Sequence, residues 1–296
     1  MSYQSFLYSF FISIVVLYLF KSLFLVFLTF KQNSFLSNIN AYISNKLFSS
    51  YLSQPYSFHL NRNASELIKN IQIEISNLNA FFLSLITIFI EGGFIVSVLA
   101  TLIYLEPLGA ISIGLFYGIL SIFFFQFTKR KLVEWGKLRQ DLDSRISKIS
   151  LEGFGGIKDI LILGKRSYFT NQYSQDNFLK ARVASNQNTV SQIPRFYLEF
   201  ISILGLISFI LMLLWQQKAI ISIIAILGVF VAATFRMIPS LNRVIAALQS
   251  LKFYRSSLDV IHTEIMDVLD IKNEIKKSND AWNFNSNIEL KNIHFS

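Results

Sequence analysis

The sequence predicts an all-α protein that crosses a membrane several times. Of its 296 residues, 53% are hydrophobic and only 15% are charged. A water-soluble domain of this length needs more polar residues to cover its surface, so part of this surface must face lipid. Backbone polar groups in lipid must be satisfied internally, and helices do this within one segment.

Five apolar stretches are long enough to cross the hydrocarbon core as helices, which takes about 20 residues each. The predicted spans are residues 5–30, 79–105, 108–128, 196–215 and 219–238. Glu106-Pro107 joins the second span to the third, and Gln216-Gln217-Lys218 joins the fourth to the fifth. Connections this short predict two antiparallel helix pairs.

The basic residues are concentrated on one side of these spans. Segments 31–78 and 129–195 and the tail after Pro239 contain four, thirteen and seven Lys and Arg, all but three of the chain's 27. Positive charge is typical of cytoplasmic segments, so all three are predicted to lie in the cytoplasm. The net charge of +9 is therefore explained by the orientation of the chain in the membrane. No nucleic acid partner is expected. With five spans, Met1 would begin outside, so we expect that a preceding helix is absent.

The two long connections are predicted to be helical extensions of the spans. Apolar residues recur at helical spacing over 41–52 and 67–78. Between these helices Pro55 interrupts the pattern, and Asn63 or Ser65 can cap the helix that follows.

The second connection repeats this plan. A helical pattern over 131–151 is followed by Gly153, Gly155 and Gly156, which free the backbone to turn. Residues 168–193 then return toward the membrane, and Pro194 marks the entry to the fourth span.

The tail is predicted to begin as an amphipathic helix, because apolar residues recur along one stripe from Leu241 to Ile261. We assign residues 1–271 to the membrane domain and the polar run 272–287 to a linker. Residues 288–296 alternate like a β-strand with one slip. Because a strand is not stable alone, it is expected to be the first strand of a further domain.

No catalytic or metal site is predicted. The chain has no cysteine, and its histidines, His59, His262 and His294, lie far apart in sequence. The nearest approach to a phosphate-binding G-x-x-x-x-G-K-[ST] loop is at Gly164, where Asp159 stands in place of the first glycine. These residues are not expected to hydrolyse ATP.

Several segments together resemble a known family. They are residues 51–56, 61–68, 153–160, 236–243 and 288–296. The chain resembles the transmembrane domain of bacterial ABC exporters of the type I (type IV) fold, with long cytoplasmic helix extensions, over nearly its whole length. Among these it is most similar to flippases of lipid-linked oligosaccharides used in protein glycosylation and O-antigen pathways.

The resemblance implies a homodimer surrounded by membrane lipids in the bacterial inner membrane. It also implies six spans per subunit and a nucleotide-binding domain on the same gene product, which would bind ATP and Mg²⁺. The first of the six spans is expected to be absent here, and the chain ends before any ATP motif.

The resemblance also implies that two turning elements, residues 55–63 and 153–163, are coupling helices that dock into nucleotide-binding domains. The first coupling helix would contain Pro55, Tyr56, Phe58, Asn61, Arg62 and Asn63. The second would contain Gly153, Gly155, Gly156, Ile157, Lys158 and Asp159. The alternative is that both are ordinary surface turns.

Three charged residues within the predicted spans are candidates for a substrate cavity, because charges in lipid are costly. Lys21 and Arg236, in the cytoplasm-proximal parts of their spans, are candidates to meet the pyrophosphate of a lipid-linked sugar. The alternative for both is snorkelling to the interface. For Glu91, mid-span beside Gly92, the alternatives are helix packing and pairing with a cation.

The expected function is therefore translocation of a lipid-linked oligosaccharide, driven by ATP. Export of another lipid, a peptide or a drug is the alternative within the family, and a membrane scaffold without transport is the alternative outside it. The resemblance implies a phosphate-binding loop about 40–50 residues beyond Ser296, and such a loop would favour the exporter over the scaffold.

Overall fold

The computed structural model describes residues 3–105, 107–215 and 220–278, and every element in these ranges is helical. The elements are α1 (Tyr3–Leu52), α2 (Tyr56–Asn61), α3 (Ala64–Lys69), the π-helical turn η1 (Asn70–Glu74), α4 (Ile75–Leu105), α5 (Pro107–Gly155), α6 (Ile157–Ile162), α7 (Arg166–Trp215) and α8 (Ile220–Ser278). The predicted all-α class is confirmed.

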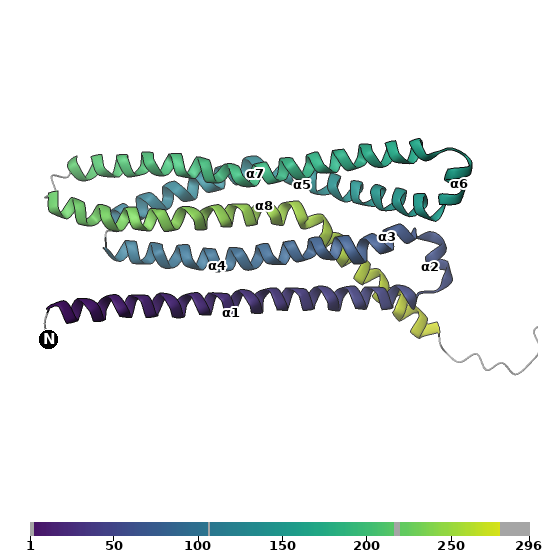
Figure 1. Ribbon diagram of the computed structural model, residues 1–296, viewed down its shortest axis with the longest axis horizontal. Helices are drawn as coiled ribbons and strands as arrows, with labels where there is room; N and C mark the ends of the chain where they lie inside the picture. The colour runs from purple at the N-terminus through teal and green to yellow at the C-terminus, as the bar shows by residue number, and fades with distance from the viewer. Residues whose placement is uncertain (1–2, 106, 216–219, 279–296) are drawn as a thin grey trace, which may run out of the picture.

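Predicted spans and their cytoplasmic extensions form continuous rods. Helices α1, α5, α7 and α8 contain 50, 49, 50 and 59 residues. At about 1.5 Å per residue each rod is far longer than the hydrocarbon core is thick. The C-terminal ends of α4 and α7 lie at the same end of the bundle as the N-terminus of the chain, whereas α2 and α6 lie at the opposite end (Figure 1).

Two helical stretches in the described part of the chain are long and apolar enough to span a membrane, Leu7–Leu52 and Ala64–Tyr104. They overlap the first two predicted spans. The other three predicted spans lie within α5, α7 and α8, except for residue 219, which lies outside the described residues, as do some side chains of these helices.

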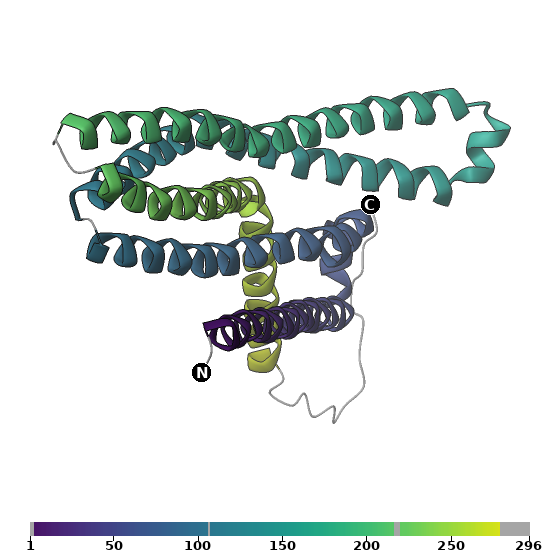
Figure 2. The same ribbon diagram turned by 60° about the vertical axis from the view of Figure 1, so that its left-hand side comes forward.

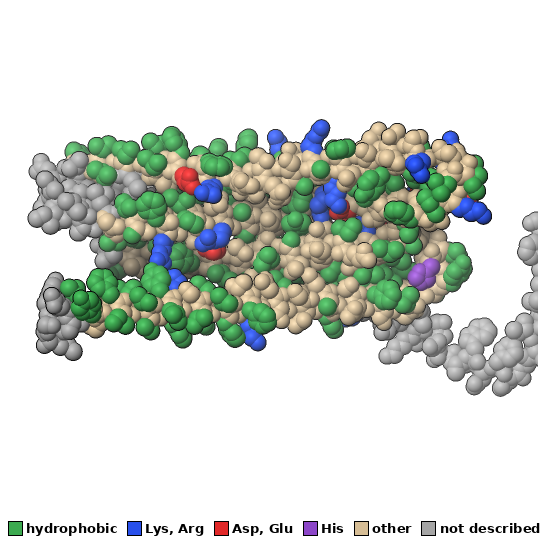
Figure 3. All heavy atoms as spheres, viewed as in Figure 1, with side chains coloured by type: hydrophobic (Ala, Val, Ile, Leu, Met, Phe, Trp, Pro, Cys, Tyr) green, Lys and Arg blue, Asp and Glu red, His purple; other side chains and the backbone are tan. Residues whose placement is uncertain are grey.

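The spanning part of α1 is highly exposed. Val15, Phe20 and Val26 are 64%, 69% and 68% exposed, and hydrophobic side chains lie along the visible face of α1 (Figure 3). A continuous apolar surface of this kind needs lipid or another protein surface to cover it.

Helix α8 connects two groups of helices. Its C-terminal part turns away from the other rods and crosses toward α1 (Figure 2). One core cluster joins α1, α4 and α8, and contains Leu47, Tyr51, Ile75, Leu78 and Ile261. Two further clusters join α5, α7 and α8: one contains Tyr117, Leu198 and Ile245, and the other Leu142, Val183 and Phe253.

Two prolines lie inside continuous helices, and one predicted boundary differs in the structure. Helix α7 runs without a break through Pro194, and α8 runs through Pro239. Helix α8 also continues to Ser278, so the first part of the predicted linker 272–287 is helical. Extending an existing helix needs no new nucleus, so a polar run rich in Lys, Glu and Ile can continue it. The rest of that linker and the predicted strand 288–296 lie outside the described residues.

Candidate functional site

The first turning element is α2, which lies between the ends of α1 and α3. Pro55 precedes it with an extended backbone, at φ −63° and ψ 156°. The side chain of Asn63 then caps α3 by accepting a hydrogen bond from the backbone N–H of Ser65 at 3.1 Å. The predicted break at Pro55 is confirmed. Of the two candidates for the cap, Asn63 and Ser65, the structure shows Asn63 in that role.

Arg62 attaches this turning element to α8. Its guanidinium forms one ion pair with Glu264 and a second with Asp267 at 2.8 Å. The hydroxyl of Tyr51, on α1, donates a hydrogen bond to Glu264 at 2.8 Å. The ring of Phe58, on α2, stacks on Tyr51 with centroids 6.1 Å apart. The carboxylate of Glu264 therefore joins the end of α1, the turning element and α8.

The electrostatics of this cluster keep both donors protonated. Burial, together with the charge of Glu264, raises the pKa of Tyr51 above its ordinary value. Burial lowers the pKa of Arg62, but the hydrogen bond and charge of Glu264 more than offset this, so that pKa is raised overall. The hydroxyl and the guanidinium therefore both remain donors to Glu264 at physiological pH.

The second turning element is α6, between α5 and α7. Of the three glycines predicted to free the backbone here, Gly156 lies at the break between α5 and α6, whereas Gly153 and Gly155 lie in the last turn of α5. A Cβ at either position would meet nothing closer than ordinary van der Waals contact. The glycine that has a left-handed backbone is Gly164, with φ of 63°, at the turn into α7.

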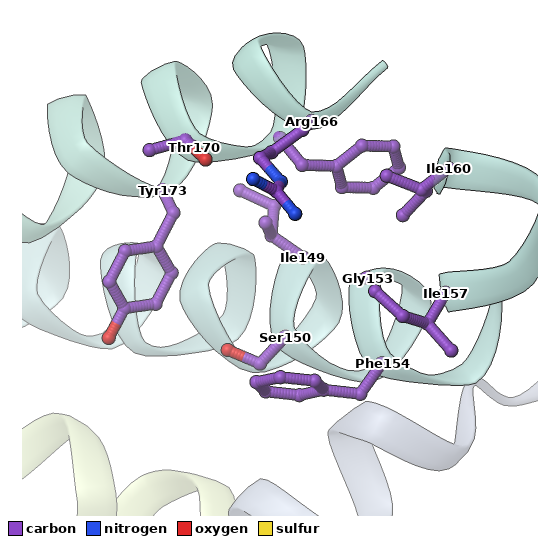
Figure 4. A pocket seen from close by; sticks show the side chains of 10 residues that line it. Ile149, Ser150, Gly153, Phe154, Ile157, Ile160, Arg166, Thr170 and Tyr173 are labelled. Atoms are coloured by element: carbon purple, nitrogen blue, oxygen red, sulfur yellow. The ribbon is translucent and has the colours of Figure 1, made fainter. Parts of the chain in front are cut away.

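A cavity of about 340 Å³ lies beside α6, between the ends of α5 and α7 (Figure 4). Its walls are mostly apolar and include Ile149, Phe154, Ile160 and Phe169. Ile160 is the buried residue of α6. Ile157 and Ile160 are the residues of α6 that line this cavity.

The outer face of α6 is exposed. Leu161, Ile162 and Leu163 are 54%, 71% and 67% exposed. Lys158 and Asp159 are also exposed, and neither forms an ion pair within the described residues. In α2, Tyr56 and Leu60 are likewise 75% and 67% exposed. Both short helices therefore present exposed apolar side chains at one end of the structure (Figure 1).

Two of the three residues predicted to line a substrate cavity contact the same tyrosine, Tyr18. Nη2 of Arg236, on α8, donates a hydrogen bond to the hydroxyl of Tyr18 at 3.0 Å. Nζ of Lys21, on α1, lies 5.4 Å from the centroid of the Tyr18 ring. A cation at this distance is attracted to the face of the ring. The structure therefore brings together two cations from distant parts of the sequence, and all three side chains are exposed.

The third candidate, Glu91, pairs with a cation. Arg243 of α8 donates two hydrogen bonds to it, with Nε–Oε1 2.5 Å and Nη2–Oε2 3.0 Å. The Glu91 side chain is 16% exposed and that of Arg243 is 52% exposed. Within the described residues no hydrogen bond joins Glu91 to Lys21 or Arg236. Of the alternatives for Glu91, the structure therefore contains the cation pair.

Comparisons with known proteins identify the family. Residues 2–215 match the ABC transporter transmembrane region. The chain is 23% identical to the ATP-dependent lipid A-core flippase of Saccharophagus degradans, over 96% of this chain and 47% of that protein. It is similar in fold to a bacterial Atm1-family ABC exporter with ATP bound, with a TM-score of 0.63 and 11% identity, over 80% of this chain and 41% of that one.

The chain thus spans about half the length of each of these two proteins. At 11% identity, the likeness to the solved exporter shows the fold alone. The family match covers most of the chain, and it agrees with long helices that end in two short turning elements. The chain therefore belongs to the family of ABC transporter transmembrane regions.

Proposed function

We propose that this chain is the translocation domain of an ATP-driven exporter that flips a lipid-linked oligosaccharide across the bacterial inner membrane. The observation that carries the proposal is the meeting of Lys21 and Arg236 at Tyr18. Two cations within predicted spans are costly in lipid unless an anion neutralises them. The pyrophosphate of a lipid-linked sugar is an anion of suitable size and charge.

Each of these residues has a distinct part in holding such a headgroup. Arg236 has five N–H donors in a planar fork, of which one is directed to Tyr18, so others are left for phosphate oxygens. Lys21 supplies a point charge with three donors. Tyr18 orients both cations and keeps them near one place on the bundle.

The two turning elements supply the mechanical part of the proposal. ATP and Mg²⁺ would bind in a nucleotide-binding domain of the same gene product, and that domain would cover the exposed faces of α2 and α6. Because α1, α5 and α7 are continuous helices, movement at the turning elements passes to the spans without an intervening loop. The spans would then alternate between inward-open and outward-open states.

A second identical subunit fits the exposed surface of the spanning helices. Apolar side chains of α1 such as Phe20 and Val26 stay uncovered in the single chain. Oligomers of identical subunits commonly have closed symmetry, and among soluble proteins a twofold pair is the commonest. The proposed homodimer would enclose the cargo between two copies of this domain.

A second candidate function is export of a different amphipathic lipid. The name of the Saccharophagus degradans relative favours it, because that protein is a lipid A-core flippase. Both candidates use the same fold and differ in the headgroup that Lys21 and Arg236 would meet.

The test is a transport assay on the full-length gene product in proteoliposomes. A fluorescent lipid-pyrophosphate-oligosaccharide is supplied with ATP, and its appearance in the opposite leaflet is followed. The Lys21→Gln/Arg236→Gln variant is expected to slow flipping by about tenfold or more, because it removes charge-assisted hydrogen bonds. Lys31→Gln is the matched control, because Lys31 lies on the same helix, 5.6 Å from the Phe27 ring.

Unchanged flipping in the double variant would remove the case for this cation pair. A parallel assay with lipid A-core separates the two candidate cargoes. Flipping of lipid A-core but not of the oligosaccharide carrier would favour the second candidate.

A further inference from the structure

A second cationic site lies between α5 and α8, away from the residues that surround Tyr18. A cavity of about 320 Å³ is lined by Lys129, Arg130, Val133, Glu134 and Lys252. Three of these five residues are basic and one is acidic. The site comes directly after the predicted span 108–128, where α5 leaves the hydrocarbon core.

The position of Lys252 opposite Lys129 and Arg130 is fixed by close helix packing. A Cβ added at Gly136 would lie 2.2 Å from the carbonyl oxygen of Phe253, so the two backbones are in near contact there. One turn earlier, Nε2 of Gln249 donates to Oγ1 of Thr128 at 3.5 Å. Helices α5 and α8 are therefore in contact at Gln249 and at Phe253, on both sides of Lys252 in the sequence.

The three cations of this cavity have no ion-pair partner in the described part of the chain. Farther along α5 from the membrane, cations do have ion-pair partners. Arg139 and Lys180 both pair with Asp143, at 3.6 Å and 2.6 Å. Within the described residues, this cavity therefore brings together three cations without ion-pair partners where α5 leaves the predicted span.

The surface of α5 next to the cavity is apolar and exposed. Phe123 and Phe127 are 68% and 76% exposed. They lie seven and three residues before Arg130, at helical spacing, so they share a face with Arg130 and Glu134. A ligand that occupied the cavity would have this apolar strip beside it on the membrane side.

We propose that this cavity binds the phosphate of an anionic phospholipid in the cytoplasmic leaflet. Lys129, Arg130 and Lys252 would donate hydrogen bonds to the phosphate oxygens, and the acyl chains would lie against Phe123 and Phe127. Basic pockets between helices on the cytoplasmic side are suited to such headgroups. The apolar strip distinguishes a lipid from free phosphate. This resident lipid is separate from the cargo and does not depend on its identity.

Native mass spectrometry of the full chain in detergent tests the proposal. The probes are dioleoyl phosphatidylglycerol, dioleoyl phosphatidylcholine and inorganic phosphate. Wild type is expected to bind phosphatidylglycerol more tightly than phosphatidylcholine. The Lys129→Gln/Arg130→Gln/Lys252→Gln variant should lose this preference, by about fivefold for each cation removed.

The matched control removes two lysines and one arginine elsewhere, in the variant Lys46→Gln/Lys165→Gln/Arg182→Gln. All three are exposed and lie outside the cavity, so the lipid preference should remain. The charge-retaining variant Lys129→Arg/Arg130→Lys/Lys252→Arg should also bind phosphatidylglycerol, which separates loss of charge from loss of fold.

Three results would overturn the proposal. One is equal binding of phosphatidylglycerol by wild type and the glutamine variant. Another is inorganic phosphate occupying the cavity while wild type shows no preference between the two lipids. A loss of binding in the charge-retaining variant, with its helix content intact, would also contradict a site built on charge.

Discussion

Arg243 of α8 binds the carboxylate of Glu91 on α4 through two parallel hydrogen bonds, with Nε–Oε1 2.5 Å and Nη2–Oε2 3.0 Å. A two-point contact between a planar guanidinium and a carboxylate fixes orientation as well as distance. Helices α4 and α8 pack extensively, and this pair sets how the two rods are rotated relative to each other.

Removing one partner of this pair is expected to destabilise the bundle. Glu91→Gln should lower the free energy of unfolding by about 1 kcal/mol, a modest value because Arg243 is half exposed and partly screened by solvent. Thermal unfolding in detergent measures the change. In a double-mutant cycle with Arg243→Gln the two effects should be less than additive. Full additivity would show that the pair contributes no coupling.

The Tyr51–Glu264 hydrogen bond predicts an alkaline dependence of stability. Burial and Glu264 raise the pKa of Tyr51, so the unfolded chain loses this proton first as pH rises. The stabilisation from the hydroxyl is therefore complete below about pH 10, the ordinary tyrosine value, and declines above it.

The Tyr51→Phe variant measures this contribution. It should be less stable than wild type by about 1 kcal/mol near neutral pH, because it lacks one hydrogen bond. The difference should shrink above about pH 10. Tyr42→Phe, at a position 66% exposed, serves as the control. A Tyr51→Phe deficit that stays constant through this range would be inconsistent with a raised pKa.

Gly136 is expected to be intolerant of any side chain. An alanine Cβ would lie 2.2 Å from the backbone oxygen of Phe253, so α5 and α8 would have to separate. Gly136→Ala should destabilise the chain by about 1–3 kcal/mol, the usual range for overpacking. Gly118→Ala, where a Cβ meets nothing within 4 Å, should be neutral or slightly stabilising. Equal melting temperatures for the two variants would contradict the close approach.

The exposed charges of α6 are expected to matter for coupling and not for folding. Reversing both, with Lys158→Glu and Asp159→Lys, should abolish most transport by the full-length gene product while ATP hydrolysis and membrane insertion continue. Reversal of Arg255 and Asp259, a pair that is 62% and 69% exposed on α8, is the control. If transport by the α6 variant matched that of the control, α6 would be an ordinary surface turn.

The parts of the fold that depend on local signals were predictable from the sequence. Pro55 lies at the break between α1 and α2, and Asn63 caps α3 through a contact two residues away. The helical extensions follow from hydrophobic periodicity in the same way, and the turn into α6 lies at Gly156, within the run of glycines. Each of these features depends on neighbours within a few positions of the chain.

The contacts that build the candidate site depend on distant neighbours. Arg62 and Glu264 are separated by 202 residues, and Arg236 and Tyr18 by 218. Spacing within a segment cannot pair such residues. A weaker signal was present for Glu264, which continues the apolar stripe of α8 one turn after Ile261 and is therefore placed to be buried. Gly136, alone inside a helical pattern, was a comparable signal for close packing.

The most direct test is the side of the membrane on which the two turning elements lie. The chain has no cysteine, so single cysteines can be placed without background labelling. Tyr56, Leu163 and Tyr104 are 75%, 67% and 89% exposed and are suitable positions. With a membrane-impermeant maleimide, Tyr56→Cys and Leu163→Cys should both react only from the cytoplasmic side, and Tyr104→Cys only from the opposite side. Labelling of positions 56 and 163 from opposite faces would contradict an exporter driven from the cytoplasm.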